Sequence, residues 1–264
     1  MRLQFFQVDA FTSRLFGGNP AAVCVLDQWL PEAVMQNIAL ENNLPETAFF
    51  VPSPDPAYDY HLRWFTPTVE MDLCGHATLA AGYCIFEHLG FTKNTIRFQS
   101  RSGLLTVTKN PTGYMLDFPV WSYEESLDVS HIENILGLKV QKVLFSKATF
   151  AILDSVDLVE NFKPDLAKIN TLENTIGLVI AARGEGSTDF VSRFFCPQIG
   201  IPEDPVTGAI HCALTPYWSN ILGKTAMNAR QLSAREGDLF LELKNDRVLI
   251  SGQAVLYLKG EINI

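Results

Sequence analysis

The chain has 264 residues, 47% of them hydrophobic, and a formal net charge of −9 at pH 7. A chain of this size and apolar content buries one large hydrophobic core or two of medium size. The acidic balance and the lack of basic runs argue against nucleic acid or an anionic membrane as the main partner. No apolar run approaches the roughly 20 residues that a membrane helix needs.

The cysteines are odd in number, widely spaced and set among apolar residues. This pattern fits reduced thiols in a cytoplasmic protein better than a disulfide framework. The five are Cys24, Cys74, Cys84, Cys196 and Cys212. The chain also opens on an alternating strand pattern, so we expect no signal peptide.

The first elements are two strands joined by a glycine-rich loop. Alternation predicts a strand over residues 3–9, and a second, apolar strand covers residues 21–26. The loop before the second strand, Phe16-Gly17-Gly18-Asn19-Pro20, is typical of a tight turn. A helix then extends from Pro31 to Ala39.

Glu46 stands at the edge of the next strand. It follows Pro45 and precedes the apolar run 48–51. On residue type alone, a glutamate in this place is a loop residue that faces water.

The stretch from Arg63 to Phe86 organises the chain, and it returns in altered form from Arg193 to Trp218. Each copy has a strand ending in Phe-x-Pro, a short acidic loop and an almost wholly apolar helix. When Arg63 is aligned with Arg193, the second copy has three extra loop residues, and Gly75 then aligns with Gly208. The repeat extends into the flanking strands, so it predicts two similar halves with one active cleft between them.

Both apolar helices begin at small residues. A helix that is apolar on nearly every face is enclosed by protein, and its N-terminus is buried with it. The first N–H groups there carry partial positive charge, and Gly75, Gly208 and Ala209 leave the backbone open to close approach. We expect these helix starts to bind a substrate carboxylate and to stabilise a developing enolate oxygen. The alternative is that the glycines only permit tight packing.

His76 directly follows Gly75, and Asp204 lies four residues before Gly208. A neutral imidazole in a first helical turn donates a hydrogen bond to substrate or carries a proton, and the alternative is a histidine that packs or caps. Asp204 is either a helix cap, a role for which Thr207 competes, or a second carboxylate that orients a substrate amine or hydroxyl.

His211 lies inside the second apolar helix, beside Cys212. We expect it to pack in the core with its ring nitrogen satisfied. A metal site would have to combine this pair with Cys74 and His76, and their spacing is not that of paired ligands. No metal is therefore predicted.

The rest of the chain is mostly strand and turn. A domain boundary is expected near residues 119–125, which gives an N-terminal domain over 1–118 and a C-terminal domain over 119–264, with the place of the last strand left open. Further strands are predicted over 61–65, 95–118, 140–153, 176–182, 189–195 and 227–258, and short helical segments over 156–169.

Four motifs together resemble the successive signatures of the PhzF-like family of phenazine-biosynthesis proteins, and the resemblance extends end to end. The motifs are FGGNPAA at 16–22, LPETAF at 44–49, DLCGHATLA at 72–80 and EDPVTG at 203–208. The resemblance implies the diaminopimelate-epimerase-like fold. This α+β fold has two pseudo-symmetric domains, each a mostly antiparallel β barrel around a central helix.

The resemblance also implies an activity. Such a protein is a cofactor-independent isomerase, and a glutamate moves a proton between carbons of a small carboxylated metabolite. That catalytic glutamate falls on Glu46, and the assisting histidine and aspartate fall on His76 and Asp204. The expected substrate-binding residues are Asn19, Gly75, Gly208 and Ala209. The resemblance further suggests a homodimer that holds no metal.

One position departs from the family pattern, and two other functions stay open. The family usually has a serine where this chain has Ala209, so a hydroxyl that could bind the substrate is missing. This puts in doubt whether the chain acts on the founding member's substrate, a phenazine precursor, but it does not affect the proton transfer. Cys74-Gly75-His76 also resembles the proline-racemase signature, but such a racemase needs a second thiol, and the repeat places Thr207 opposite Cys74. The other alternative is a binding protein that kept the fold and lost the chemistry.

Overall fold

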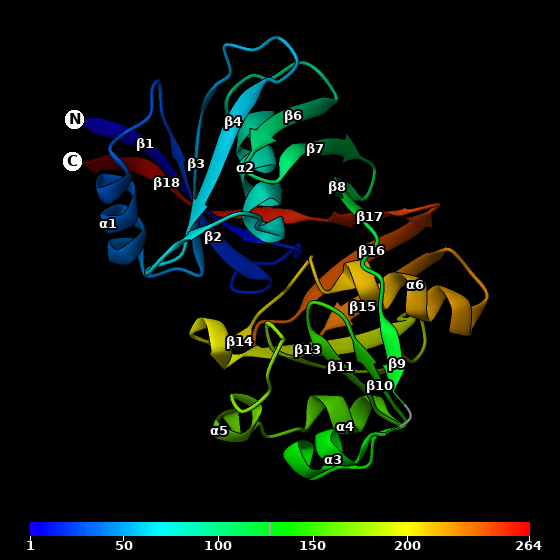
Figure 1. Cartoon of the computed structure of the whole chain (residues 1–264). Helices are drawn as coiled ribbons and strands as arrows, with labels where there is room; N and C mark the ends of the chain where they lie inside the picture. The colour runs from blue at the N-terminus through cyan, green and yellow to red at the C-terminus, as the bar shows by residue number, and fades with distance from the viewer. Residues whose placement is uncertain (127) are drawn as a thin grey trace. The chain divides into compact units, whose positions relative to one another are not determined.

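The chain folds into two compact units. The computed structural model describes residues 1–126 and 128–264. Unit 1 comprises Met1–Phe118 and Leu249–Ile264, and unit 2 comprises Pro119–Val248. The last strand therefore belongs with the N-terminal part of the chain rather than with the rest of 119–264. In Figure 1 this strand, β18 in red, runs beside β1 in dark blue, with which it pairs antiparallel.

Unit 1 is a sheet of mostly antiparallel strands. They pair in the order β18, β1, β2, β3, β4, β6, β7, β8, with β5 beside β4. The pairs β2–β3 and β4–β6 are parallel, because α1 and α2 cross over between them. The bounds are β1 (Arg2–Ala10), β2 (Asn19–Val25), α1 (Glu32–Asn42), β3 (Glu46–Pro52), β4 (Tyr60–Phe65), β5 (Glu70–Met71), α2 (Gly75–His88), β6 (Thr95–Ser100), β7 (Gly103–Asn110), β8 (Gly113–Pro119) and β18 (Ala254–Asn263).

Unit 2 repeats this arrangement. Its strands pair in the order β9, β10, β11, β12, β13, β15, β16, with β14 beside β13, and the parallel pairs β11–β12 and β13–β15 again flank helices. The bounds are β9 (Glu124–Ser126), α3 (Ser130–Leu136), β10 (Lys142–Phe145), β11 (Thr149–Ile152), α4 (Val156–Glu160), α5 (Leu166–Ile169), β12 (Leu178–Arg183), β13 (Phe190–Cys196), the 3-10 turn η1 (Pro197–Ile199), β14 (Ile201–Asp204), α6 (His211–Leu222), β15 (Ala226–Gln231) and β16 (Gly237–Lys244), and β17 (Arg247–Gly252) leads back to unit 1. The helix α3 was not predicted from the sequence.

The apolar helix α2 is the centre of unit 1. It packs against β1, β2, β3, β7 and β18, and every residue from Gly75 to Gly82 is buried. At Gly82 a Cβ atom would lie 2.7 Å from a methyl group of Val107 on β7, so glycine permits the helix to approach the strand. The helix begins at Gly75 as the sequence predicted.

The corresponding helix of unit 2, α6, begins later than the sequence predicted. Its regular part starts at His211, and the residues from Gly208 onward form a tighter first turn. The backbone N–H of His211 donates to the carbonyl of Gly208 and that of Cys212 to Ala209, both at 3.1 Å. These bonds span three residues, as in a 3-10 turn, which commonly opens an α-helix.

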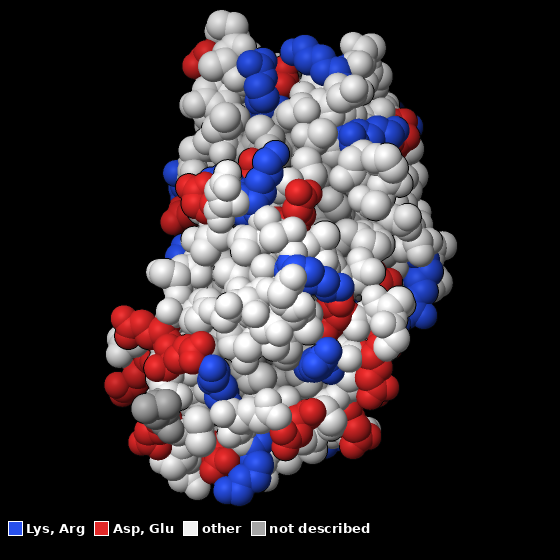
Figure 2. Space-filling model, turned by 90° about the vertical axis from the view of Figure 1, so that its right-hand side faces the viewer, with Lys and Arg blue, Asp and Glu red and all other residues white. Residues whose placement is uncertain are grey.

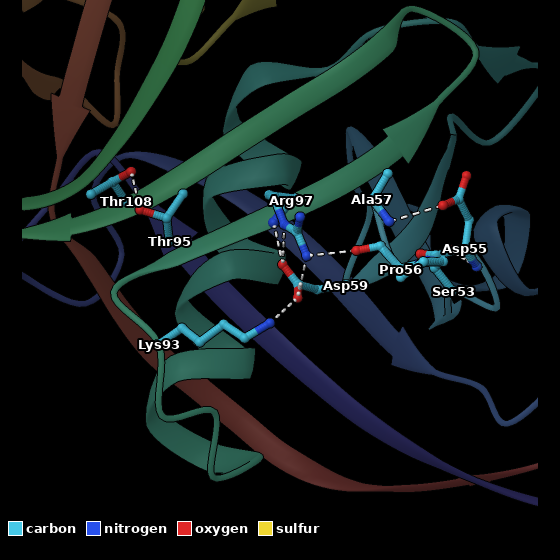
Figure 3. A network of polar contacts seen from close by, with 9 residues as sticks. All are labelled: Ser53, Asp55, Pro56, Ala57, Asp59, Lys93, Thr95, Arg97 and Thr108. Carbon is cyan, nitrogen blue, oxygen red and sulfur yellow. Dashed lines mark hydrogen bonds and ion pairs between the residues drawn. The ribbon is translucent and has the colours of Figure 1, made fainter.

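A half-buried aspartate holds the loop between β3 and β4 against β6. Asp59 receives hydrogen bonds from the side chain and backbone of Arg97 and from Lys93 (Figure 3). Burial alone would raise the pKa of Asp59, but these hydrogen bonds lower it to about 2. The carboxylate therefore stays charged at neutral pH and stabilises this loop.

The surface carries charges of both signs. On the face drawn in Figure 2, the Lys and Arg side chains of the described residues lie apart from one another among Asp and Glu, without a continuous basic patch. In the part of the chain that the structure describes, no helix has both the length and the apolar character needed to cross a membrane.

Candidate active site

Glu46 is the first residue of β3, and its neighbours bury it. It is 8% exposed. The parallel pairing of β2 with β3 places Glu46 opposite Ala21 and so brings it close to Asn19 at the start of β2. A loop glutamate that faces water, which residue type alone favours, is therefore not what the fold contains.

The start of α2 brings the second candidate residue to this place. Cys74 precedes the helix in an extended conformation, and the hydroxyl of Thr78 donates to its carbonyl. Gly75 and His76 form the first turn and are buried. His76 therefore has a fixed position inside unit 1.

The carboxylate of Glu46 faces the ring of His76. Its Oε2 atom lies 3.2 Å from Nε2. The contact is close enough for an ion pair, but neither atom has a well-aligned hydrogen bond to any described residue. A buried polar atom in this state is unusual in a folded protein, and here it leaves the pair able to accept a partner that is not part of the chain.

The other ring nitrogen of His76 has neighbours of its own. Nδ1 lies 3.2 Å from Nδ2 of Asn19 and 3.6 Å from Sγ of Cys74. When the ring is neutral, the Asn19 amide donates to Nδ1, and the ring proton then sits on Nε2, toward Glu46. If the amide turns by 180°, its oxygen can accept a hydrogen bond from Nδ1–H, so Asn19 can also bind the protonated ring.

The protonation of His76 depends on Glu46. Burial alone would lower the pKa of His76, but its contacts with Cys74 and Glu46 raise it well above 6.5. Burial also raises the pKa of the Cys74 thiol, and the charge of Glu46 raises it further. Since this sulfur is then neutral at pH 7, the carboxylate of Glu46 is the group that holds a proton on the ring.

Glu46, Cys74 and His76 also offer the kind of atoms that bind zinc. One ligand atom from each lies within 4.8 Å of the others. However, the sulfur lies against Nδ1 and the carboxylate against Nε2, and a single metal ion binds only one nitrogen of a ring. The arrangement fits a proton-bearing cluster better than a set of metal ligands.

In unit 2, Asp204 ends the short strand β14 and is 8% exposed. The preceding residue, Glu203, accepts two hydrogen bonds from Arg193 of β13, which fixes the strand next to its neighbour. The hydroxyl of Thr207 donates to Oδ2 of Asp204. Thr207 thus contacts the aspartate directly, and α6 has no side-chain N-cap.

Gln231 is a buried residue at this place that the sequence analysis missed. It is fully buried at the end of β15 and binds both Asp204 and Thr207. The strand alternates exposed and buried residues, and Gln231 falls on the buried side with Met227 and Ala229. A glutamine at a buried strand position was the available signal, because such a group needs partners inside the fold.

The predicted site residues thus form two groups. Asn19, Glu46, Gly75 and His76 come together in unit 1, and Asp204, Gly208 and Ala209 come together in unit 2. For His211 the sequence predicted a packed core residue with its ring nitrogen satisfied. The residue is buried and its Nδ1 donates to the carbonyl of Thr207 at 2.8 Å, while Nε2 is buried without a partner among the described residues. Burial lowers the pKa of His211 to about 4.

A surface groove of about 870 Å³ lies elsewhere in unit 2. It is lined by residues 119–124 and 145–147. None of the predicted site residues lines it. Its size therefore does not identify the place of the chemistry.

Comparison with known proteins places these residues in context. The PhzC-PhzF family, described as phenazine biosynthesis-like protein, matches residues 8–260. An "uncharacterized isomerase" of Pseudomonas aeruginosa is 45% identical over 265 residues, covering 100% of both chains. A crystal structure of a phenazine biosynthesis protein PhzF family member from Enterococcus faecalis has a TM-score of 0.95 and 45% identity, covering 100% of both chains.

The fold extends to more distant proteins. A predicted epimerase from Pseudomonas aeruginosa has a TM-score of 0.72 at 19% identity, with 98% of this chain and 99% of the other covered, which shows a shared fold alone. The fold is therefore the epimerase-related α+β architecture that the four motifs predicted. On the extent of these matches, the chain belongs to the PhzC-PhzF family of phenazine biosynthesis-like proteins, relatives of which are named isomerases.

Proposed function

We propose that this protein is an isomerase that moves a proton between two carbons of a small carboxylated metabolite, with Glu46 as the acid and base. The observation that carries the proposal is the buried contact of Glu46 Oε2 with His76 Nε2, at 3.2 Å. A carboxylate that is buried, lies close to a proton-bearing ring and has one oxygen without an aligned hydrogen bond is a suitable general base.

The proton transfer has three parts. The carboxylate of Glu46 takes a proton from a carbon next to a carbonyl or carboxylate of the substrate, and the electron pair spreads into the substrate as an enolate. Backbone N–H groups at the start of α2, beginning at Gly75, stabilise negative charge that develops near them. Glu46, now protonated, returns the proton to another carbon on the same face.

Other residues assist. His76 keeps its Nε2–H toward Glu46 and so sets the orientation of the carboxylate. Asn19 is assigned a positioning role, since its amide lies on His76 Nδ1. Asp204 accepts a hydrogen bond from a substrate amine or hydroxyl, and the N–H groups of Gly208 and Ala209 take the substrate carboxylate.

A cysteine-based racemase is the weaker candidate. It would need a thiolate at Cys74, and burial raises the pKa of this thiol. It would also need a second acid. The residue that stands before the helix glycine in unit 2 is Thr207, whose hydroxyl already donates to Asp204.

The experiment is a proton-exchange screen. The protein is incubated in heavy water with a panel of small carboxylated metabolites, and ¹H NMR follows the loss of carbon-bound proton signals. We expect at least one metabolite to exchange, and Glu46→Gln to slow that exchange by about 100-fold or more, a typical effect of removing a general base. Cys74→Ser is the matched control, and it should retain most of the rate.

Two results would contradict the proposal. If exchange survives in Glu46→Gln and disappears in Cys74→Ser, the racemase is correct. If a metabolite raises the melting temperature of the protein and yet no bound metabolite exchanges a proton, the protein is a binding protein. Urea unfolding of each variant shows whether a lost rate reflects a lost fold.

A further inference from the structure

Every polar group of Thr207 is bound by another residue of unit 2. Its N–H donates to Gln231 Oε1 at 2.9 Å, and its Oγ1 lies 3.2 Å from Gln231 Nε2. Its carbonyl accepts a hydrogen bond from Nδ1 of His211. Its hydroxyl donates to Oδ2 of Asp204. This threonine has no freedom to turn its hydroxyl elsewhere.

The direction of these hydrogen bonds follows from Gln231. Its oxygen accepts the N–H of Thr207, so its nitrogen must face the other way. That nitrogen donates to the carbonyl of Asp204 at 2.8 Å and to Oγ1 of Thr207. Because an amide nitrogen is only a donor, the hydroxyl oxygen of Thr207 is an acceptor there, and its hydrogen must go to Asp204.

The fold brings Gln231 to this place from a distant part of the chain. It is 27 residues from Asp204 and 24 from Thr207 in the sequence. The parallel pairing of β15 with β13 sets Gln231 opposite Ser192, and β14, which ends at Asp204, pairs with the same strand β13. Gln231 is fully buried, so its three hydrogen bonds are not exchanged with water.

We propose that Gln231 and Thr207 are positioning residues that hold the Asp204 side chain as an ionised acceptor for a substrate amine or hydroxyl. This inference rests on the proposed function for the role of Asp204. The hydroxyl of Thr207 stabilises the charged carboxylate, and Gln231 fixes both the backbone of Asp204 and the direction of that hydroxyl. Neither Gln231 nor Thr207 is required to touch the substrate.

The test is the titration of the Asp204 carboxyl carbon. Protein labelled with ¹³C at the aspartate carboxyl carbon is followed by NMR from pH 7 to pH 2, and the signal of Asp204 is assigned by its absence in Asp204→Asn. Thr207→Val removes the hydroxyl at nearly constant shape, and Thr207→Ser keeps it. We expect the midpoint to rise by about one pH unit in Thr207→Val and to stay near the wild-type value in Thr207→Ser.

Other charges near Asp204 are common to both variants. Glu203 is paired with Arg193 from β13, and His211 approaches Thr207 from α6. Burial lowers the pKa of His211 to about 4, so the ring signals of His211 are recorded in the same titration to separate its protonation from that of Asp204. Gln231→Met is the second variant, and it should raise the midpoint in the same direction.

Equal midpoints in wild-type, Thr207→Val and Gln231→Met protein would overturn the inference. A rise in Thr207→Ser as large as that in Thr207→Val would also overturn it, since the hydroxyl would then not be the cause. If the midpoint rises as expected but the wild-type protein exchanges no proton with any bound metabolite, the positioning stands and the proposed function fails. The two failures are therefore distinguishable.

Discussion

Arg193 and Glu203 form in unit 2 the same paired hydrogen bonds that Arg63 and Glu70 form in unit 1. The arginine Nε and one terminal nitrogen donate to the two carboxylate oxygens, at 2.7 and 3.0 Å in unit 2 and at 2.6 and 2.7 Å in unit 1. The partners are ten residues apart in unit 2 and seven in unit 1, a difference of three that equals the loop insertion in the aligned sequences. The pair fixes the loop before each apolar helix.

The two arginines should differ in how much they stabilise the fold. Arg193 also donates to three backbone carbonyls after β11, those of Val159, Glu160 and Phe162. We expect Arg193→Met to lower the free energy of unfolding by about 2–3 kcal/mol, because it leaves a half-buried carboxylate and these carbonyls without a donor. Urea unfolding measures this.

Arg63→Met should cost only about 1 kcal/mol, because Arg101 still contacts Glu70 in that variant. Equal effects of the two substitutions would contradict this account. Arg193→Lys is the control that keeps the charge but loses the forked geometry of the guanidinium. Its free energy of unfolding should lie between those of the wild type and Arg193→Met.

The contact of Glu46 with His76 predicts a pH-dependent stability. The pKa of His76 is raised in the folded protein, so the stabilisation is fully present below the unfolded value near 6.5 and disappears as the pH rises through the folded value. The difference in unfolding free energy between wild type and Glu46→Gln should therefore be larger at pH 6 than at pH 10. If this difference does not change with pH, Glu46 is not the group that keeps the His76 ring protonated.

Asn19 should control the protonation of His76. Around the protonated ring the Asn19 amide presents its oxygen to the Nδ1–H. Asn19→Leu removes this acceptor of the charged form, so we expect the pKa of His76 to fall below its wild-type value. Asn19→Asp adds a negative charge at the same distance and should raise it. Histidine ring ¹⁵N shifts, recorded against pH, report both changes. An unchanged titration in both variants would leave Asn19 as a substrate contact only.

Asp59 predicts stability that is lost in acid. Its pKa is about 2 in the folded protein, below the ordinary value of 3.8, so its contribution is present above about pH 4 and is lost as the pH falls toward 2. Its side chain is 8% exposed, but Lys93 is largely solvated, so we expect Asp59→Asn to cost about 1–2 kcal/mol at pH 6. Near pH 2 the cost should be close to zero, as measured by urea unfolding at each pH.

Gly18 should be intolerant of a side chain. It has φ of +61°, and a Cβ atom there would lie 2.1 Å from the carbonyl oxygen of Ala10. We expect Gly18→Ala to destabilise by more than about 2 kcal/mol and to displace the neighbouring Asn19. Gly90→Ala is the control, since Gly90 has a similar φ of +70° with nothing within 4 Å, and it should cost only about 1 kcal/mol. If both substitutions lower the free energy of unfolding by similar amounts, the backbone strain of a positive φ, and not the clash with Ala10, is the cause.

The sequence by itself determined the repeat, the two apolar helices and the family. Apolar periodicity, the Gly-Gly-Asn-Pro loop, the Phe-x-Pro strand ends and the four motifs are local, so they can be recognised without coordinates. Glu46, His76 and Asp204 were predicted as site residues in this way, because each lies within a short motif. Local pattern also predicted most strands, but it missed the short helix α3.

Tertiary structure alone decided the partners of these residues. The parallel pairing of β2 with β3 buries Glu46 near Asn19, and the parallel pairing of β13 with β15 brings Gln231 to Asp204. Parallel strands are joined through helices, so their neighbours are far apart in the sequence and leave no local pattern. Only the folded sheet decides which buried polar groups meet. Burial alone lowers the pKa of both His76 and His211, but the neighbours Cys74 and Glu46 raise that of His76 well above 6.5, while that of His211 stays low.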